Sequence, residues 1–364
     1  MKDIYFVNAL KGSLSTKEIC KLNKFYPIKF VPLSDGGDGF LETVAYAFPT
    51  AKKHFVHAKN ALNKTKKVSY LTYRDCAFLE CANIAGLAEI KIQRRNVMKA
   101  NSFGIGTVLK TIGKAKIKTV YIGLGGVAFN DGGAGCLQAL GYKLLDDKNN
   151  QIPLGILGLL KLKKIIAPKN LKVPKIICFS DVENKLFGKD GSAQVYGPQK
   201  GANKEEVIKI EHALKNFQKI IGKNLNKKYY GASGALPVSL CGVLGAEIKK
   251  GTQEIFKILK IKNLIKGAGL VVTSEGCLDE QSYFGKAPFE ILKIAKKYKK
   301  RVYFICGKNK LSSKALKNYT NLEVAELCAL AKNEKDSFKN AAKYLQKVLG
   351  GLYENYKKTY YFRA

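Results

Sequence analysis

The chain has 364 residues, of which 64 are Lys or Arg and 28 are Asp or Glu, so its formal net charge is +36. This length exceeds the size at which a single hydrophobic core usually stops growing, which predicts two domains. Hydrophobic residues make up 46% of the chain, which excludes wholesale disorder, and no apolar run is long enough for a transmembrane helix. Because the first residues lack the features of a signal peptide, we expect a cytoplasmic protein.

The excess of positive charge could indicate a nucleic-acid partner. All but five of the 64 basic residues are Lys, however, and specific base recognition favours Arg. The Lys residues are spread along the chain in pairs, which favours a solvated surface, and we expect neither a nucleic-acid nor a membrane partner. The nine Cys include no Cys-x-x-Cys pair and only three His accompany them, so a zinc site is not expected.

The first elements alternate between strand and helix. An apolar run at residues 3–8 predicts a strand, and Ser15 with Glu18 matches the capping box that opens a helix. A second strand is predicted at 28–31, followed by a helix that ends near Phe48. This alternation predicts a parallel sheet covered by helices.

The middle of the chain has a different pattern. Shorter alternating runs at 53–58 and 66–82 predict strands of a second, mixed sheet. The following predictions are a helix over 102–114, a strand over 118–124, a helix ending at 140, a loop and helix over 154–162, and strands at 175–179 and 269–273. The final third returns to a helix at 287–298, a strand at 302–306 and a helix at 336–349. The first and last parts of the chain share a helix–strand alternation that the middle lacks. This pattern predicts a discontinuous domain with a large insertion.

Five segments share one layout, in which an apolar strand is followed by a glycine-rich loop with charged or amide side chains. In open α/β sheets, ligands bind beyond the carboxyl ends of the strands, and glycine lets the backbone approach a phosphate. Carboxylates in such loops imply Mg²⁺ or a hydroxyl proton to accept. The segments are Lys11-Gly12-Ser13, Asp35-Gly36-Gly37-Asp38-Gly39, Asn130-Asp131-Gly132-Gly133, Ser180-Asp181-Val182-Glu183-Asn184, and Ser274 to Gln281 with Gly285-Lys286 following.

Each loop also has a simpler structural interpretation, as a helix N-cap, a turn or a solvated run of charges. Two independent Asp-Gly-Gly loops favour function over a turn. No P-loop, protein-kinase glycine-rich loop, dinucleotide-binding fingerprint or nucleophile elbow is present. The residues alone therefore indicate an α/β enzyme for phosphoryl transfer or for an anionic substrate.

At these loops the sequence resembles the bacterial class I glycerate kinases over nearly its whole length. The matching segments occur in the family's order: Lys11 to Ser15, Pro32 to Gly39, Ser102 to Gly106, Gly123 to Gly141, Tyr196 to Ala202, and Val272 to Lys286. The resemblance implies ATP-dependent phosphorylation of D-glycerate to 2-phosphoglycerate with Mg²⁺, and a possible homodimer. It also implies a flavodoxin-like parallel-sheet domain with a second, mixed α/β domain inserted into it. We expect the first domain at residues 1–65 and 286–364, the inserted domain at 66–285, and the active site in the cleft between them.

The resemblance supplies candidate roles for the loop residues. We expect a pool of carboxylates to provide the general base and Mg²⁺ ligands, and a set of cationic, amide and glycine residues to bind substrate and phosphates. The catalytic candidates are Asp35, Asp131, Asp181, Glu275 and Asp279, of which Asp181 and Glu275 are the metal candidates. The binding candidates are Lys11, Gly12, Ser13, Gly36, Gly37, Asn130, Gly132, Gly133, Lys200, Gln281 and Lys286.

The sequence departs from the family's motifs at several loop positions. Asn8-Ala9-Leu10 replaces Asp-Ser-Phe, Val127 and Phe129 replace Ser and Thr, and Ser274 and Cys277 replace Gly and Arg. Losing the Arg removes a bidentate anion contact. Two alternatives therefore stay open beside the main reading: a catalytically weakened homologue or a kinase for another small hydroxy acid, and a Lys-rich nucleic-acid-binding protein.

Overall fold

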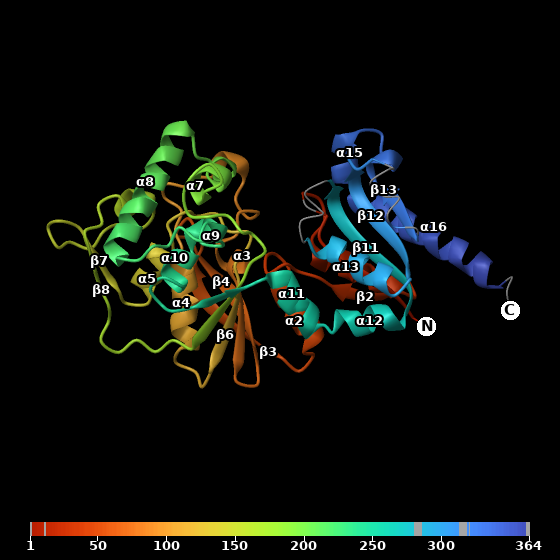
Figure 1. Cartoon of the computed structure of the whole chain (residues 1–364), viewed down its shortest axis with the longest axis horizontal. Coiled ribbons are helices and arrows are strands. Elements are labelled where there is room, and N and C mark those ends of the chain that lie inside the picture. Colours follow the sequence, from red (N-terminus) through yellow and green to blue (C-terminus); the bar gives the residue numbers. More distant parts are fainter. Residues whose placement is uncertain (1, 11, 280–285, 313–318, 320, 362–364) are drawn as a thin grey trace. The chain divides into compact units, whose positions relative to one another are not determined.

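The computed structural model describes residues 2–10, 12–279, 286–312, 319 and 321–361. The chain forms two compact units, each with its own sheet (Figure 1). Unit 1 comprises Met1–Ser34 and Thr252–Ala364, and unit 2 comprises Asp35–Gly251. Unit 1 is thus built from two separate stretches of chain, with unit 2 inserted between them.

The sheet of unit 1 has five strands, and each is parallel to its neighbours. In spatial order they are β2 (Lys29–Pro32), β1 (Lys2–Val7), β11 (Ala268–Leu278), β12 (Arg301–Asn309) and β13 (Leu322–Glu326). Numbered by their occurrence within the unit, this is the order 2-1-3-4-5 of flavodoxin-like folds. The parallel, flavodoxin-like sheet expected from the sequence is confirmed.

Helices of unit 1 pack against this sheet. Ile19 of the first helix and Leu345 and Leu349 of the last share a core with Tyr5 and Val272 of the strands. The helices are α1 (Thr16–Cys20), the short η1 (Lys21–Phe25), α11 (Gly251–Ile258), α12 (Ile261–Gly267), α13 (Ala287–Lys297), the short η5 (Cys328–Leu330), α15 (Glu334–Lys339) and α16 (Ala341–Tyr361). The capping box expected at Ser15 and Glu18 is present at the start of α1. The single helix expected at 336–349 is two helices, because α15 ends at Asn340.

The main sheet of unit 2 has six strands and is mixed, as the sequence predicts. In spatial order they are β10 (Glu247–Lys249), β9 (Lys175–Phe179), β6 (Thr119–Gly123), β5 (Cys76–Glu80), β4 (Thr65–Tyr73) and β3 (Lys52–Lys59). The first four are parallel, and β3, β4 and β5 pair antiparallel. A small antiparallel pair, β7 (Lys143–Leu145) and β8 (Lys164–Ile166), lies outside this sheet.

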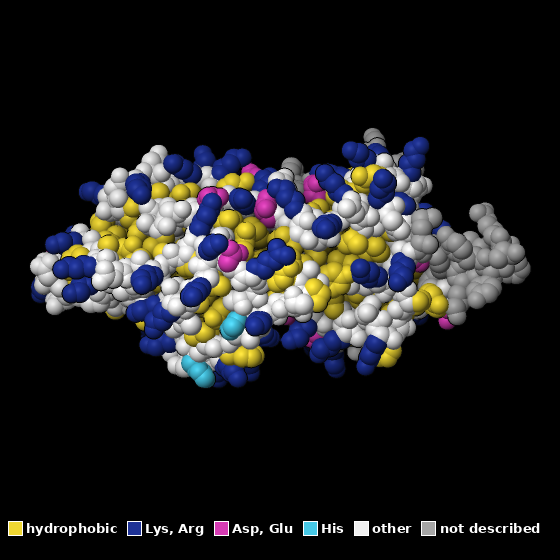
Figure 2. Space-filling view, turned by 90° about the horizontal axis from the view of Figure 1, so that it is seen from below, with side chains coloured by type: hydrophobic (Ala, Val, Ile, Leu, Met, Phe, Trp, Pro, Cys, Tyr) yellow, Lys and Arg dark blue, Asp and Glu magenta, His cyan; other side chains and the backbone are white. Residues whose placement is uncertain are grey.

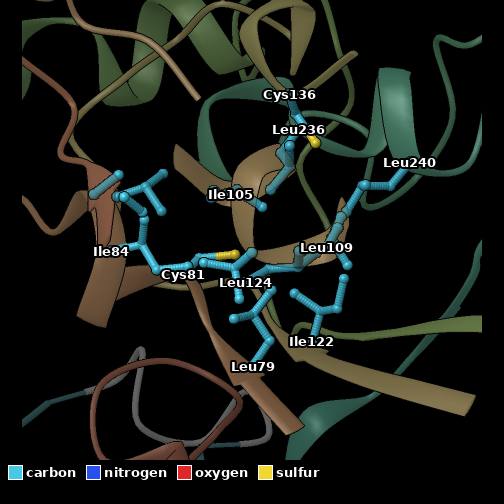
Figure 3. Packing of buried hydrophobic residues seen from close by; sticks show 14 of the residues in the cluster. Leu79, Cys81, Ile84, Ile105, Leu109, Ile122, Leu124, Cys136, Leu236 and Leu240 are labelled. Atoms are coloured by element: carbon cyan, nitrogen blue, oxygen red, sulfur yellow. The ribbon is translucent and has the colours of Figure 1, made fainter. Parts of the chain in front are cut away.

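The helices of unit 2 are mostly short. They are α2 (Phe40–Ala47), α3 (Cys81–Ala85), η2 (Ile92–Arg94), α4 (Phe103–Ile112), α5 (Ala134–Ala139), α6 (Ile156–Leu159), α7 (Ser192–Tyr196), η3 (Pro198–Lys200), α8 (Lys204–Ile221), α9 (Ala232–Ala235) and α10 (Pro237–Leu240). Figure 3 shows the core that joins them to the sheet, in which Leu79 and Ile122 of the strands point toward Ile105 and Leu109 of α4. A second core forms under α8 through Val207, Ile210, Leu214 and Phe217.

Two strands determine the unit boundaries. β3 pairs antiparallel with β4 over its whole length, so residues 52–59 belong to unit 2. β11 lies between β1 and β12, so residues 268–278 belong to unit 1. The boundaries expected at 65/66 and 285/286 are therefore corrected to 34/35 and 251/252. The chain enters and leaves unit 2 at one place, because a Cβ atom at Gly251 would lie 1.9 Å from the carbonyl oxygen of Asp35.

The basic residues are spread over the surface. On the face drawn in Figure 2, Lys and Arg side chains are scattered among uncharged ones, with few acidic side chains between them. None of the described helices is long and apolar enough to cross a membrane.

Candidate active site

The glycine-rich loop at Asp35–Gly39 packs against the carboxyl edge of the sheet in unit 2. The carbonyl oxygen of Gly36 accepts a hydrogen bond of 3.2 Å from the N–H of Gly125, which follows β6. A Cβ atom at Gly36 would lie 2.8 Å from the carbonyl oxygen of Phe179, the last residue of β9. The approach is so close that only glycine fits, and the positive φ of 91° at Gly36 also favours glycine.

Three carboxylates belong to the loops at this edge. Asp35 is exposed, and its Oδ1 accepts a hydrogen bond of 2.9 Å from the N–H of Gly37. Asp38 lies against the second glycine-rich loop, where a Cβ atom at Gly126 would be 3.0 Å from its Oδ1. Asp181 is half-buried and follows β9 by two residues. The structure therefore brings Asp35, Gly36 and Gly37 together with the end of β9, as the sequence predicts for a ligand-binding edge.

A fourth carboxylate, Glu80, is buried at the end of β5 and was not expected from the sequence. Its Oε2 accepts a hydrogen bond of 2.9 Å from the N–H of Leu41 in the first turn of α2. Burial above all, together with the nearby carboxylates of Glu42 and Asp38, raises the pKa of Glu80 to about 8. Glu80 therefore ties the helix that follows the Asp35–Gly39 loop to the sheet. The signal for it was present, since Glu80 directly follows an apolar strand as the other acids do.

Glu183 is engaged in an ion-pair cluster beside this edge. Its carboxylate lies 2.9 Å from Nζ of both Lys228 and Lys250, and these hydrogen bonds lower the pKa of Glu183 to about 2. Asp181 lies near enough to Lys250 to help raise the pKa of that amine. The Ser180–Asn184 segment therefore combines one carboxylate held by two Lys residues with another at the sheet edge.

The second Asp-Gly-Gly loop has a different position, because it is buried. Asp131 has no exposed surface, and its carboxylate accepts four hydrogen bonds. Oδ2 is bonded to the N–H and hydroxyl of Ser102 at 2.9 Å and to the N–H of Gly135 at 3.1 Å, and Oδ1 to the N–H of Gly133 at 3.1 Å. Burial raises the pKa of Asp131, although these bonds act in the opposite direction. This geometry suits a residue that holds the loop better than one that contacts substrate.

Lys200 is also directed into the protein. Only 3% of the residue is exposed, and Nζ donates to the carbonyl oxygen of Phe129 at 2.6 Å and to Oδ1 of Asn130 at 3.0 Å. Burial lowers the pKa of Lys200 to about 7, while the nearby carboxylate of Asp131 acts to raise it. Asn130 is buried too and donates to the carbonyl oxygen of Ser192. In this structure Lys200 therefore contacts the loop itself, and its expected phosphate contact stays a prediction.

A strained turn supports the same loop from another side. Ser233, Gly234 and Ala235 all have positive φ, an uncommon conformation for residues with a side chain. The carbonyl oxygen of Gly234 accepts a hydrogen bond of 3.0 Å from the N–H of Gly132, and the hydroxyl of Ser233 donates to the carbonyl oxygen of Leu124. Gly132 and Gly133, like Asn130, are thus buried parts of a rigid loop.

In unit 1, the charged candidates meet at the carboxyl end of β11. Lys286 lies 2.9 Å from Oε1 of Glu275 and 3.7 Å from Oδ1 of Asp279. The side chain of Glu275 is 5% exposed and that of Lys286 is 34% exposed, so the pair lies partly out of water. The structure therefore brings together Glu275, Asp279 and Lys286, which the sequence placed in one site.

Glu275 and Lys286 line a pocket of about 260 Å³, as does Ser13. The hydroxyl of Ser13 donates to the carbonyl oxygen of Leu10 at 3.0 Å. A Cβ atom at Gly12 would lie 2.8 Å from Cε1 of Phe338, so this glycine, with a φ of 86°, lets the loop pass beneath that ring. Lys11 and Gln281, two further candidates, lie outside the described residues.

A family model described as the glycerate kinase family matches residues 4–356. The chain belongs to the glycerate kinase family. It is 32% identical over 326 residues to the glycerate 2-kinase of Escherichia coli, a match that covers 84% of this chain and 85% of that protein. It is 29% identical over 366 residues to the glycerate kinase of Bacillus subtilis, which covers 96% of each chain.

The fold agrees with this family. The crystal structure of a glycerate kinase 2 candidate from Salmonella typhimurium LT2 has a TM-score of 0.71 and 28% sequence identity. That match covers 98% of this chain and 99% of the other. Both units of this glycerate kinase family member are therefore present in a solved relative.

A kinase of this family would use ATP, so we asked which residues could hold the accompanying metal ion. Among the described residues, no group of three or more His, Cys, Asp or Glu side chains is arranged as a metal site. In phosphoryl-transfer enzymes, Mg²⁺ is usually held by one or two carboxylates together with substrate phosphates and water. The exposed Asp35 and the half-buried Asp181 fit that requirement. Glu275, the other metal candidate, belongs to unit 1, so a joint role with Asp181 stays a prediction.

Proposed function

We propose that this protein transfers the terminal phosphoryl group of ATP to the 2-hydroxyl of D-glycerate, which yields 2-phosphoglycerate and ADP. Family membership and the Escherichia coli relative named glycerate 2-kinase support the reaction and its position on the substrate. The observation that carries the proposal is the glycine-lined edge of unit 2, where the Gly36 and Gly125 backbones pack closely together beside exposed Asp35. We expect the reaction to take place in the cytoplasm, and a homodimer remains a prediction.

The candidate carboxylates divide into accessible and buried groups. Asp35, Asp181 and Asp279 retain exposed surface, and we assign the general base and the Mg²⁺ ligands to them together with Glu275, which is buried beside Lys286. Mg²⁺ would neutralise charge on the transferred phosphoryl group, which is a large part of catalysis in such reactions. Lys286, which is one-third exposed, would contribute positive charge. Asp131 and Lys200 are buried, and we assign them to positioning of the Asn130–Gly133 loop.

A kinase for a different small hydroxy acid is the second candidate, and a departure from the family's motif favours it. Cys277 replaces the family's Arg. A thiol cannot make the bidentate contact with a carboxylate that a guanidinium makes. A changed acid substrate would follow from this loss.

The deciding experiment is a coupled assay of ADP release by the full chain with Mg²⁺ and ATP. D-glycerate, L-glycerate, hydroxypyruvate and related acids are compared, and the product is identified as 2- or 3-phosphoglycerate by NMR. We expect turnover with D-glycerate and the 2-phosphate as product. Absence of ADP release with D-glycerate at high enzyme concentration would refute the proposal, and preference for another acid would establish the second candidate.

A further inference from the structure

The pocket of unit 1 has two different walls. It lies where β11 and β12 end, and its far wall comes from Leu327 after β13, Phe338 of α15 and Ala341 of α16. This wall presents apolar side chains, although Glu334 and Ser337 of α15 also line the pocket, whereas the other side contributes Lys286, Lys308 and Lys310. Two acids, Glu275 and Glu334, also line it, so the lysines exceed the carboxylates by one.

The apolar wall contains an aromatic ring with an open face. Phe338 is 47% exposed although it is a large hydrophobic residue, and one edge of its ring rests on Gly12. Leu327 and Ala341 beside it are buried. An exposed phenyl ring next to buried aliphatic groups is a suitable surface for a flat aromatic ligand.

The cationic side contains two lysines that point into water. Lys308 and Lys310 lie at and just beyond the end of β12 and are exposed. Among the described residues, no carboxylate lies within ion-pair distance of either amine, whereas Lys286 is paired with Glu275. The strand ends approach closely here, because a Cβ atom at Gly307 would lie 2.4 Å from the carbonyl oxygen of Gly276. Both glycines line the pocket, so part of its surface is backbone without side chains.

The size of the pocket indicates which of the two substrates of the proposed reaction it binds. At about 260 Å³ it is close to the lower limit of ~300 Å³ for pockets that take drug-sized molecules. A three-carbon acid would leave most of this volume and the whole apolar wall unused. The base and sugar of a purine nucleotide fill such a volume, and the phosphates of the nucleotide need cations.

We propose that this pocket is the nucleotide subsite, with the purine ring against Phe338 and Leu327 and the phosphates at Lys308 and Lys310. The assignment rests on the proposed kinase activity and adds the location of one substrate. It also gives Phe338 and the two lysines a binding role that the sequence did not indicate.

The first test is calorimetric titration of the full chain with ADP and Mg²⁺. Phe338→Ala and the double variant Lys308→Gln/Lys310→Gln should each raise the Kd of ADP about tenfold, the scale of one lost stacking contact. Phe25→Ala and Lys293→Gln change an exposed ring and an exposed amine of unit 1 outside this pocket and are the controls. The KM of D-glycerate should change less than twofold, roughly the error of such a measurement. A raised KM of D-glycerate with an unchanged Kd of ADP would overturn the assignment.

The second test uses thiols already present. Cys277 and Cys328 line the pocket, whereas Cys20 and Cys76 are similarly half-buried and lie elsewhere. Iodoacetamide alkylates each thiolate with loss of iodide, and peptide mass spectrometry follows the rate at every Cys. Saturating ADP should slow alkylation of Cys328 and Cys277 and leave Cys20 and Cys76 unchanged.

The outcomes separate the two proposals. Protection by D-glycerate alone, or no protection under conditions where calorimetry detects ADP binding, would refute the pocket assignment. Protection by ADP in a protein that does not phosphorylate D-glycerate would support the nucleotide subsite and refute the proposed acid substrate.

Discussion

The hydroxyl of Ser274 donates a hydrogen bond of 2.9 Å to the carbonyl oxygen of Asn8 and lies 3.4 Å from the N–H of the same residue. Ser274 is a buried residue of β11, and Asn8 follows β1, its neighbour in the sheet. Both residues are departures from the family's motifs. The two substituted residues therefore contact each other, and the hydroxyl of Ser274 holds the loop that begins at Asn8.

Replacing Ser274 with glycine, the residue of the family's motif, should destabilise this protein. The change removes a buried hydrogen bond, worth about 1 kcal/mol, and adds the backbone freedom of glycine in a strand, about 0.5–1 kcal/mol. Urea denaturation should therefore show a loss of about 1.5–2 kcal/mol for Ser274→Gly. Ser274→Ala, which removes only the hydroxyl, is the control and should lose about 1 kcal/mol. A glycine variant as stable as the wild type would contradict this account.

Lys200→Met tests whether this amine holds the loop. Methionine has a similar length but leaves the carbonyl oxygen of Phe129 and Oδ1 of Asn130 without their donor, at a cost of about 1–3 kcal/mol. We expect a lower melting temperature together with a reduced kcat, because the Asn130–Gly133 loop would shift. Lys215→Met, on the exposed side of α8, is the matched control. If Lys200→Met melted like the wild type, the amine would not be an anchor.

The titration of Lys200 should appear in the pH dependence of stability. Its pKa is about 7 in the folded protein and 10.5 when exposed, so the unfolded chain binds more protons between these values. The free energy of unfolding should therefore rise with pH above 7, by up to about 1.4 kcal/mol per unit. Lys200→Met lacks this contribution, so comparing urea denaturation of both proteins from pH 7 to 9 isolates it. Parallel pH profiles would show that the amine is charged in the folded state throughout.

Glu80 should make the free energy of unfolding fall, rather than rise, as the pH increases in a lower pH range. Its pKa is about 8 when folded and 4.5 when exposed, so the folded protein holds a proton that the unfolded chain releases. Stability conferred by this proton is complete below pH 4.5 and is lost as the pH rises toward 8. In Glu80→Gln, which keeps an acceptor for the N–H of Leu41, the decline between pH 5 and 8 should flatten. Melting temperatures across that range would measure it, and an unchanged slope would mean that Glu80 is ionised when folded.

Asp35 and Asp131 should differ when each is replaced with asparagine. Asp35 is exposed, so Asp35→Asn should melt within about 1 °C of the wild type but lose about a hundredfold in kcat, the scale of a lost acid–base group. Asp131→Asn places an amide among N–H donors and should cost about 2–3 kcal/mol of stability. Melting curves and the ADP-release assay measure both effects. Near-wild-type kcat in both variants would refute the acidic-loop mechanism.

Much of the fold was predictable because its strands are short apolar runs separated by glycine-rich turns. The longest helix of unit 2, α8, was nevertheless missed, although Asn203 and Glu206 form a capping box before it and Gly222 ends it. Most residues of α8 are polar, and only one stripe of apolar residues indicates that one face of the helix is buried. The unit boundaries were misplaced for a different reason: only strand pairing assigns β3 and β11 to their sheets, and pairing is not local in sequence.

The sequence predicted the motifs of the candidate site. It did not predict how deeply each residue of these motifs is buried. Asp35 and Asp131 occupy the same Asp-Gly-Gly pattern, yet one is exposed and the other has no exposed surface. The difference comes from residues distant in sequence, such as Ser102 and Lys200, which surround the second loop. A motif specifies the local backbone, whereas burial depends on what packs over it.

The contact between Gly251 and the carbonyl oxygen of Asp35 has a consequence for how this chain can be divided. Because the two ends of unit 2 meet, a short linker from Ser34 to Thr252 would make the flavodoxin-like unit continuous, and closing so short a loop has a small entropic cost. The excised segment would likewise have adjacent ends, as independently folding insertions commonly do. We therefore expect that each unit can be produced as one continuous chain.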